Sequence, residues 1–275
     1  MLSAVSSLNK TGAQPKRSPT PNPHCGIMYE YHYRMVSMNI QMLREDQVSA
    51  APPSKFFLLL EGRAALEYGH LLLTRNKLKQ LPRGDGHPVM FVPGFGASDS
   101  SMRAMRKVFS DLGYATYGWG LGRNTGMNRR IKEGLGQHLQ DIFQRHGQKI
   151  SLIGWSLGGV YVREMARAQP QLVRRVITLG SPINGHPEAN NVSALFHLVN
   201  RNKKINLDWE GFQKRRIPPP VPCTAISSKT DGIVAWRCSQ EEPAPNTENV
   251  HVSSSHFGLA VNPRVLKIVA ERLAK

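Results

Sequence analysis

The sequence has few cysteines, few acidic residues and no long apolar run, and each shortage excludes a class of protein. Three cysteines in 275 residues are too few for a disulfide-stapled scaffold. The longest apolar runs, Phe56 to Leu60 and Leu71 to Leu73, are far shorter than the roughly 20 residues needed to cross a bilayer. Since 40% of the residues are hydrophobic and 20% are charged, the composition is that of a globular protein.

The shortage of acidic residues leaves a strongly basic chain. Against 19 aspartates and glutamates stand 36 lysines and arginines, which gives a net charge of +17. Such a balance is typical of proteins that bind nucleic acid or an anionic membrane surface. The basic residues are scattered in small groups, however, and no helix–turn–helix, zinc-finger or aromatic stacking motif accompanies them. We therefore expect no nucleic-acid partner and at most weak contact with an anionic membrane, for which Arg215 and Arg216 are the first candidates.

The chain begins with a segment unlike the rest. Thr11 to Cys25 is rich in Pro, Ser, Thr and Asn and has no apolar period, so residues 1–54 are predicted to be a disordered leader. They lack the basic start, apolar centre and small-residue cleavage site of a secretory signal. We therefore expect a cytoplasmic protein.

A helix is predicted next, from Lys55 to Arg75, within an N-terminal helical segment at residues 55–81. Its broad apolar surface comprises Phe56, Phe57, Leu60, Ala64 and Leu71. Such a helix can lie on a membrane surface. Glu61 and Glu67 interrupt any basic face, however, and this favours packing against the body of the protein.

From residue 82 onward, apolar runs of strand length alternate with helical patterns. The predicted strands are Pro88 to Val92, Tyr114 to Trp119, Lys149 to Trp155, Val173 to Leu179, Cys223 to Ser227 and Asn249 to Val252. Continuous apolar strands separated by helices predict an α/β fold, with a mostly parallel central sheet of about six strands and helices on both faces. Ser98 or Asp99 is expected to cap the helix after the first strand, and Asn262 the last helix. The polar, basic stretch at residues 183–220 is predicted to be a short cap insertion.

The segment Gly154 to Gly158 is a G-x-S-x-G motif that places Ser156 between a predicted strand and a predicted helix. A serine that acts as a nucleophile needs a sharp strand-to-helix turn that exposes it, with small neighbouring residues that let the strand and the helix approach each other. Ser156 is therefore the candidate nucleophile.

A serine nucleophile needs a base and an acid, which in such folds follow it along the chain. Asp231 and His256 come in that order, each just past a predicted strand, where ligands gather in open parallel sheets. The rivals are weaker, because Asp208, Glu210 and His186 fall in the insertion and His251 lies inside the last predicted strand. We expect the main-chain N–H groups of Leu157 and Phe95 to form the oxyanion hole, since Leu157 follows the serine and Phe95 lies between two glycines after the first strand.

Taken together, four segments resemble the motif set of the α/β-hydrolase superfamily, particularly its bacterial lipase-like and esterase-like members. They are Val92 to Gly96, Gly154 to Gly159, Thr230 to Val234 and Ser255 to Gly258. The resemblance covers residues 82–275 and implies the α/β-hydrolase fold and a Ser–His–Asp triad. Two features depart from the family: many lipases have His-Gly where this chain has Pro93-Gly94, and the usual first two strands are not visible.

The sequence thus predicts a serine hydrolase that cleaves carboxylic esters of a small molecule or lipid through Ser156, Asp231 and His256. An acyltransferase with the same triad, or a non-catalytic scaffold that binds a partner, remains the alternative. Neither a metal nor a cofactor is expected, because no cluster has metal-ligand spacing and no glycine pattern suggests a phosphate site. Whether Cys223 and Cys238 form a disulfide is left open.

Overall fold

The computed structural model describes residues 52–184 and 215–275, and its centre is a parallel sheet of six strands in the order β2-β1-β3-β4-β5-β6. The strands are β1 (Pro88–Val92), β2 (Ala115–Tyr117), β3 (Ile150–Trp155), β4 (Val173–Leu179), β5 (Cys223–Ser228) and β6 (Thr247–Val252). Every neighbouring pair is parallel, so all carboxyl ends lie at the same edge. The predicted fold class and strand number are confirmed.

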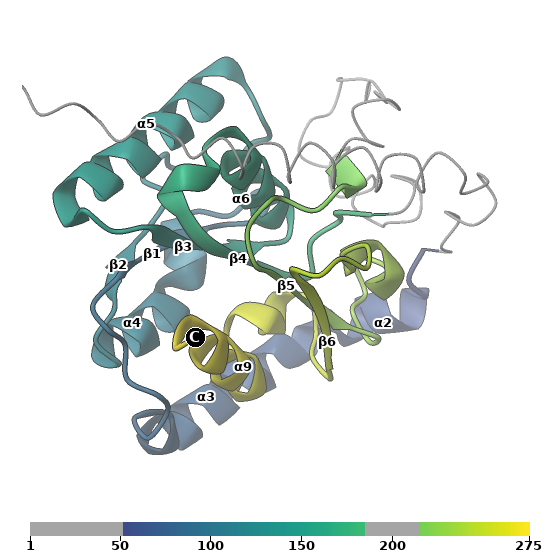
Figure 1. Ribbon diagram of the computed structural model, residues 1–275. Helices are drawn as coiled ribbons and strands as arrows, with labels where there is room; N and C mark the ends of the chain where they lie inside the picture. Colours follow the sequence, from purple (N-terminus) through teal and green to yellow (C-terminus); the bar gives the residue numbers. More distant parts are fainter. Residues whose placement is uncertain (1–51, 185–214) are drawn as a thin grey trace, which may run out of the picture.

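Helices cover both faces of the sheet (Figure 1). One face packs against α3 (Ala64–Leu78), α4 (Arg103–Asp111) and α9 (Pro263–Leu273), and the other against α5 (Arg129–His146) and α6 (Leu157–Ala168). Alternate residues of β1 serve the two layers: Val89 and Phe91 join the first core, whereas Met90 and Val92 join the second. This two-sided burial explains the continuous apolar strands of the sequence.

The start of α4 departs from prediction. Ser98 precedes a short 3₁₀ turn, Asp99–Met102, but its side chain makes no capping hydrogen bond. Asp99, the other predicted cap, is the first residue of that turn. Its carboxylate instead accepts hydrogen bonds from the main-chain N–H groups of Trp119 (2.8 Å) and Gly120 (3.1 Å). Because those amides bond to Asp99, β2 ends at Tyr117, two residues earlier than predicted. At the other end of the chain, Asn262 caps α9 as predicted.

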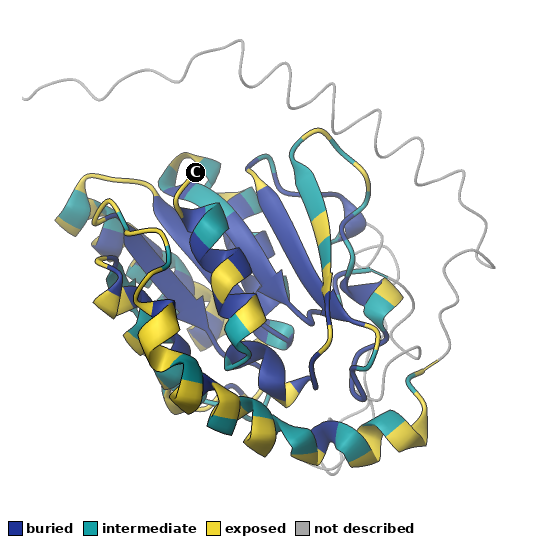
Figure 2. Ribbon diagram, turned by 90° about the horizontal axis from the view of Figure 1, so that it is seen from below, coloured by how far each residue is buried: buried dark blue, intermediate teal, exposed yellow. Residues whose placement is uncertain are grey.

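The segment before the sheet is an extended helical structure, Lys55 to Leu78, which we call the N-terminal rod. It consists of α2 (Lys55–Leu59), a 3₁₀ turn (Leu60–Arg63) and α3, where a single helix ending at Arg75 was predicted. The rod lies along the body, and α3 packs against α9 (Figures 1 and 2).

Four of the five apolar residues expected to face the body do so: Leu71 is buried, and Phe57, Leu60 and Ala64 are half-buried. Phe56 is 64% exposed, whereas Glu61 is only 5% exposed. Leu71 and Leu78 do pack into the core. The predicted packing is thus present, but the inner surface is partly acidic and the outer surface is apolar.

The insertion is anchored to the body at its C-terminal end by Arg163 on α6. This buried guanidinium donates to the carbonyl oxygens of Arg215 (2.6 Å) and Arg216 (3.3 Å) and pairs with the buried carboxylate of Glu241 (2.6 Å). Arg216 is itself buried and pairs with Glu242. The expectation that Arg216 meets a membrane is therefore wrong, because its charge is already neutralised inside the protein.

Several expectations fall on residues that the structure does not describe. The leader up to residue 51, Cys25, and the candidates His186, Asp208 and Glu210 lie outside the described ranges. Cys223 and Cys238 are separate buried thiols rather than a disulfide. No helix within residues 52–184 and 215–275 is long and apolar enough to cross a bilayer.

Replacing Arg163 with methionine should be strongly destabilising, because it leaves the Glu241 carboxylate buried without its charge partner. Breaking such a pair costs about 3–5 kcal/mol. The free energy of unfolding, measured by urea denaturation, should fall by that amount. The matched control is Arg129→Met, which removes the exposed Arg129–Glu133 pair and should cost about 0.5 kcal/mol or less. Equal losses in the two variants would contradict the assigned role of the buried pair.

Candidate active site

Ser156 lies in the turn between β3 and α6 with a strained main chain. Its φ of 54° and ψ of −125° make it the only non-glycine residue with positive φ in the described part of the chain. Such a conformation costs about 1–3 kcal/mol and persists only where the surroundings enforce it. A Cβ atom on Gly158 would clash with the carbonyl of Val92, so glycine at that position allows α6 to approach β1 closely. The strand–turn–helix context predicted for the serine is confirmed.

Asp231 and His256 are brought together as the sequence predicted. Asp231 follows β5, His256 follows β6, and the Nδ1–Oδ2 distance between them is 2.7 Å. Both side chains are buried, and the other carboxylate oxygen of Asp231 accepts the N–H groups of Ile233 and Val234, each at 2.8 Å. An ionised carboxylate only accepts, so Nδ1 of His256 carries the proton and Nε2 is left as the basic nitrogen.

Gly180 provides the room for this pair at the end of β4. Its φ is 54°, and a Cβ atom there would lie 3.1 Å from Oδ2 of Asp231 and 3.2 Å from Nδ1 of His256. A side chain at this position would therefore crowd the hydrogen bond itself.

The main chain of His256 is held at both of its polar groups. Its N–H donates to Oε1 of Glu61 on the N-terminal rod (2.9 Å). Its carbonyl oxygen accepts the indole N–H of Trp155 (3.0 Å), and the two rings lie 5.8 Å apart. Because Trp155 immediately precedes Ser156, this bond ties the histidine loop to the serine turn.

The environment raises the pKa of His256 above its ordinary value. Burial alone would lower it, since the low dielectric disfavours the imidazolium. The charge and hydrogen bond of Asp231 and the charge of Glu61 outweigh that cost.

The loop after β1 lies against Ser156 and is held by a buried asparagine. A Cβ atom on Gly94 would lie 3.0 Å from Cβ of Ser156, so Phe95 follows a residue in direct contact with the serine. The Asn124 side chain donates to the Pro93 carbonyl (2.9 Å), and its main-chain carbonyl accepts from Gly96 (2.7 Å). Leu157, the other predicted donor, is the first residue of α6.

Four residues around the site were not identified as such from the sequence. Trp155 and Asn124 fix the histidine loop and the β1 loop, and Glu61 and Glu67 reach the same region from the N-terminal rod. The only sequence signal was the presence of Glu61 and Glu67 in a helix with a broad apolar surface. His251, a predicted rival, bonds instead to Ser227 (2.9 Å) in the neighbouring strand.

A second Ser–His–Asp arrangement lies at the opposite edge of the sheet. Nε2 of His87 lies 2.8 Å from Oγ of Ser151, and Nδ1 of His87 pairs with Asp85. Ser151 and His87 are completely buried. Ser151 lies within β3 and His87 immediately precedes β1, and neither residue has a strained main chain. Burial lowers the pKa of His87 and favours its neutral form. Since no substrate can reach Ser151, this cluster is structural.

No cluster of three or more His, Cys, Asp or Glu side chains in the described ranges could hold a metal ion.

Comparison with known proteins identifies the fold. No family model matches the chain, and no curated protein matches it in sequence. Among solved structures, the lipase BlEst2 of Bacillus licheniformis in its mature form is similar, with 18% identity and a TM-score of 0.52 over 70% of this chain and 94% of that one. The monoacylglycerol lipase of Paleococcus ferrophilus is similar with 13% identity and a TM-score of 0.51, over 70% of this chain and 96% of that one. A pyrethroid hydrolase of Sphingobium faniae JZ-2 has 17% identity and a TM-score of 0.50, over 68% of this chain and 97% of that one. The chain thus has the α/β-hydrolase fold, as its motifs implied.

Substituting Asp231 with asparagine should lower the pKa of His256, because burial then acts without the opposing carboxylate charge. The measurement is an NMR titration of the ring, assigned among the ten histidines by comparison with a His256→Gln variant. Asp208→Asn serves as the matched control and should leave the pKa of His256 unchanged. A fall in the control, or no fall with Asp231→Asn, would show that another acid partners the histidine.

Proposed function

We propose that the protein is a serine hydrolase that cleaves carboxylic esters through an acyl-enzyme on Ser156. The observation that carries the proposal is the buried Asp231–His256 pair, which lies at the same sheet edge as the strained Ser156 and is tied to it through Trp155. The fold shared with two lipases and a pyrethroid hydrolase supports the same class of reaction.

In the acylation step, Ser156 Oγ attacks the ester carbonyl carbon while Nε2 of His256 accepts the hydroxyl proton. Asp231 holds the Nδ1–H tautomer and stabilises the imidazolium that forms. When the tetrahedral intermediate collapses, the bond to the alcohol oxygen breaks and His256 returns the proton to the leaving alcohol. This leaves an acyl group on Ser156 and a neutral histidine.

Water completes the cycle by the same route. His256 removes a proton from the water as it attacks the acyl carbon, and then protonates Ser156 Oγ as the acid is released. In both halves the negative charge on the carbonyl oxygen requires preorganised donors. We assign these to the main-chain N–H groups of Leu157, the first residue of α6, and of Phe95, which follows Gly94 in the β1 loop.

The insertion at residues 183–220 is proposed to form a wall of the acyl pocket. The apolar residues Leu195, Phe196, Leu198 and Val199, proposed to line this pocket, lie outside the described residues.

A fluorophosphonate probe should label Ser156 covalently, and p-nitrophenyl butyrate should be hydrolysed to the free acid in water without added alcohol. Ser156→Ala should abolish labelling and lower turnover by at least about 10³-fold. Ser151→Ala is the matched control, because that serine also contacts a histidine but is inaccessible, and labelling should persist. Labelling or turnover that survives Ser156→Ala would overturn the proposal.

A further inference from the structure

Glu61 is a buried carboxylate in the 3₁₀ turn of the N-terminal rod, and its only close partners among the described residues are main-chain N–H groups at the candidate site. Oε1 accepts from His256 (2.9 Å) and Gly232 (2.8 Å), and Oε2 accepts from Phe257 (3.1 Å). Each such bond to an ionised acceptor is stronger than a neutral one. The Glu61 side chain thus bonds both to Gly232, the residue after the proposed acid Asp231, and to the proposed base His256.

These contacts join two loops at the residues that carry the proposed acid and base. The loop of Asp231 follows β5, and the loop of His256 follows β6. Where the loops begin, Ser228 and Thr230 bond to Ser254, and Arg63 bonds to both loops. Beside Asp231 and His256 themselves, Oε1 of Glu61 accepts one N–H from each loop.

We infer that Glu61 is a positioning residue for the proposed hydrolase: its carboxylate sets the alignment of His256 with Asp231 and Ser156. The inference rests on the proposed function, since positioning matters only if His256 acts as the base. A misplacement of about 1 Å in such a group can cost about a hundredfold in rate.

The charged groups around His256 permit a clean test. Asp231 and Glu61 raise the pKa of His256 through their charges, against the effect of burial. The other charged residues of the rod here bond to flanking groups: Glu67 accepts from Ser255 N–H and Ser254 Oγ, and Arg63 donates to the Ser254 and Thr230 carbonyls. Glu67 is therefore a matched control, a carboxylate on the same rod that holds the same loop without acting on the histidine charge.

The experiment compares Glu61→Gln, Glu61→Asp and Glu67→Gln in the full chain. In Glu61→Gln, kcat for p-nitrophenyl butyrate should fall by about ten- to a hundredfold with KM nearly unchanged. Because the base must be neutral and its pKa falls when the Glu61 charge is removed, the acidic limb of the pH–rate profile should move to lower pH. Glu61→Asp keeps the charge, so the midpoint of its acidic limb should stay closer to the wild-type pH than that of Glu61→Gln. Glu67→Gln should leave this midpoint unchanged.

NMR titration of His256 reads the same shift without any turnover. Wild-type protein that hydrolyses no ester, while Glu61→Gln still lowers the pKa of His256, would overturn the proposed function and leave the contact geometry standing. Equal effects of Glu61→Gln and Glu67→Gln on kcat and midpoint would overturn the positioning role and make both carboxylates structural.

A separate observation concerns the outer surface of the rod. Most large apolar side chains that remain exposed in the described ranges lie on it, among them Phe56, Leu58, Leu59, Leu66, Leu72 and Leu73. Leu59, Leu66 and Leu73 are 83%, 76% and 86% exposed, and Leu66 and Leu73 lie seven residues apart on the same side of α3. Figure 2 shows the exposed side of the rod facing away from the body. We call these six exposed apolar residues the outer face.

The charges that flank the outer face are of one sign. Both carboxylates of the rod turn inward, whereas Lys55 at one end and Lys77 and Lys79 at the other are exposed. An apolar surface with cationic ends is complementary to an anionic lipid layer, in which apolar side chains enter the acyl boundary and lysines remain among headgroups.

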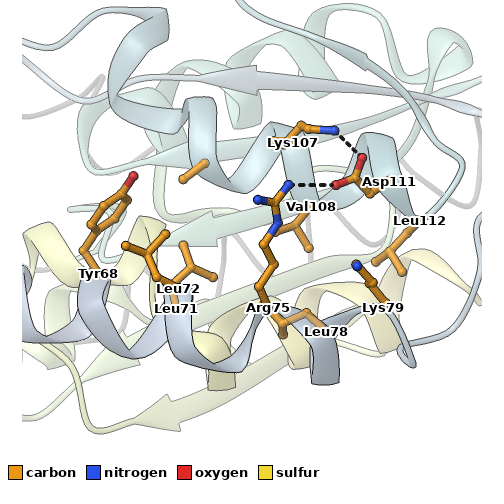
Figure 3. Close-up of a pocket in the computed structure, with 11 residues that line it drawn as sticks. Tyr68, Leu71, Leu72, Arg75, Leu78, Lys79, Lys107, Val108, Asp111 and Leu112 are labelled. Atoms are coloured by element: carbon orange, nitrogen blue, oxygen red, sulfur yellow. Dashed lines mark hydrogen bonds and ion pairs between the residues drawn. The ribbon is translucent and has the colours of Figure 1, made fainter.

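A groove between α3 and α4 continues this surface (Figure 3). Its volume is about 140 Å³, and its floor is formed by Leu71, Leu78, Val108 and Leu112. Arg75, Lys79 and Lys107 lie at its rim, where Arg75 and Lys107 share Asp111 as a partner. The groove thus repeats the pattern of an apolar floor beneath cationic side chains.

We propose that the outer face docks on an anionic phospholipid surface. The test uses Ser156→Ala protein, so that binding is read without hydrolysis, in flotation with vesicles of phosphatidylcholine alone or mixed equally with phosphatidylglycerol. Binding should require the anionic lipid and weaken with salt. Leu66→Glu should weaken it by at least about tenfold, which is the loss expected when one leucine no longer enters the apolar layer.

Met127→Glu is the matched control, since it adds the same charge at an exposed apolar residue away from the rod, and it should bind as before. No binding to anionic vesicles, or equal losses in the two variants, would overturn the proposal. A wild-type dimer that Leu66→Glu converts to monomer, measured by sedimentation, would instead assign the outer face to a second copy of the chain.

Discussion

Carboxylates that accept main-chain N–H groups hold the loops at the carboxyl edge of the sheet. Asp231 orders its own loop in this way, Glu61 joins that loop to His256, and Asp99 holds the segment after β2. These loops also bury apolar side chains such as Val234, Leu259 and Trp119, and the charge-assisted hydrogen bonds add to that packing by holding the main chain. The same arrangement accounts for part of the basic surface. The chain has only 19 acidic residues, and some of them are turned inward.

The N-terminal rod is accordingly not a peripheral addition to the hydrolase fold. Its inner side carries Glu61 and Glu67, which bond to the loop that presents His256, and its outer side exposes leucines. An amphipathic helix normally buries the apolar side and exposes the charged one. The rod departs from this rule only in part. Leu71 and Leu78 are buried as usual, but Glu61 and Glu67 are turned inward as well, because main-chain N–H groups of neighbouring loops bond to them and make their burial favourable.

Ser151 and Ser156 are each associated with a histidine that is paired with an aspartate, but their surroundings give them different roles. Ser151 lies within a buried strand at the amino edge of the sheet, where parallel strands present no crevice. Ser156 lies at the carboxyl edge in a strained turn, beside loops that converge from β1, β5 and β6. Proximity of a serine to a histidine is therefore insufficient, and access and main-chain conformation decide which pair is suited to chemistry.

The sequence by itself determined the sheet, its helical layers and the positions of Ser156, Asp231 and His256, because these depend on local apolar period and on residues that follow strand ends. It did not determine what Glu61 and Glu67 do. Glu61 and His256 are 195 residues apart, and nothing near Glu61 in sequence distinguishes a solvated carboxylate from a buried one. Only the folded chain brings the main-chain N–H groups of Gly232, His256 and Phe257 to that side chain, so the inward orientation of Glu61 is a property of tertiary contacts.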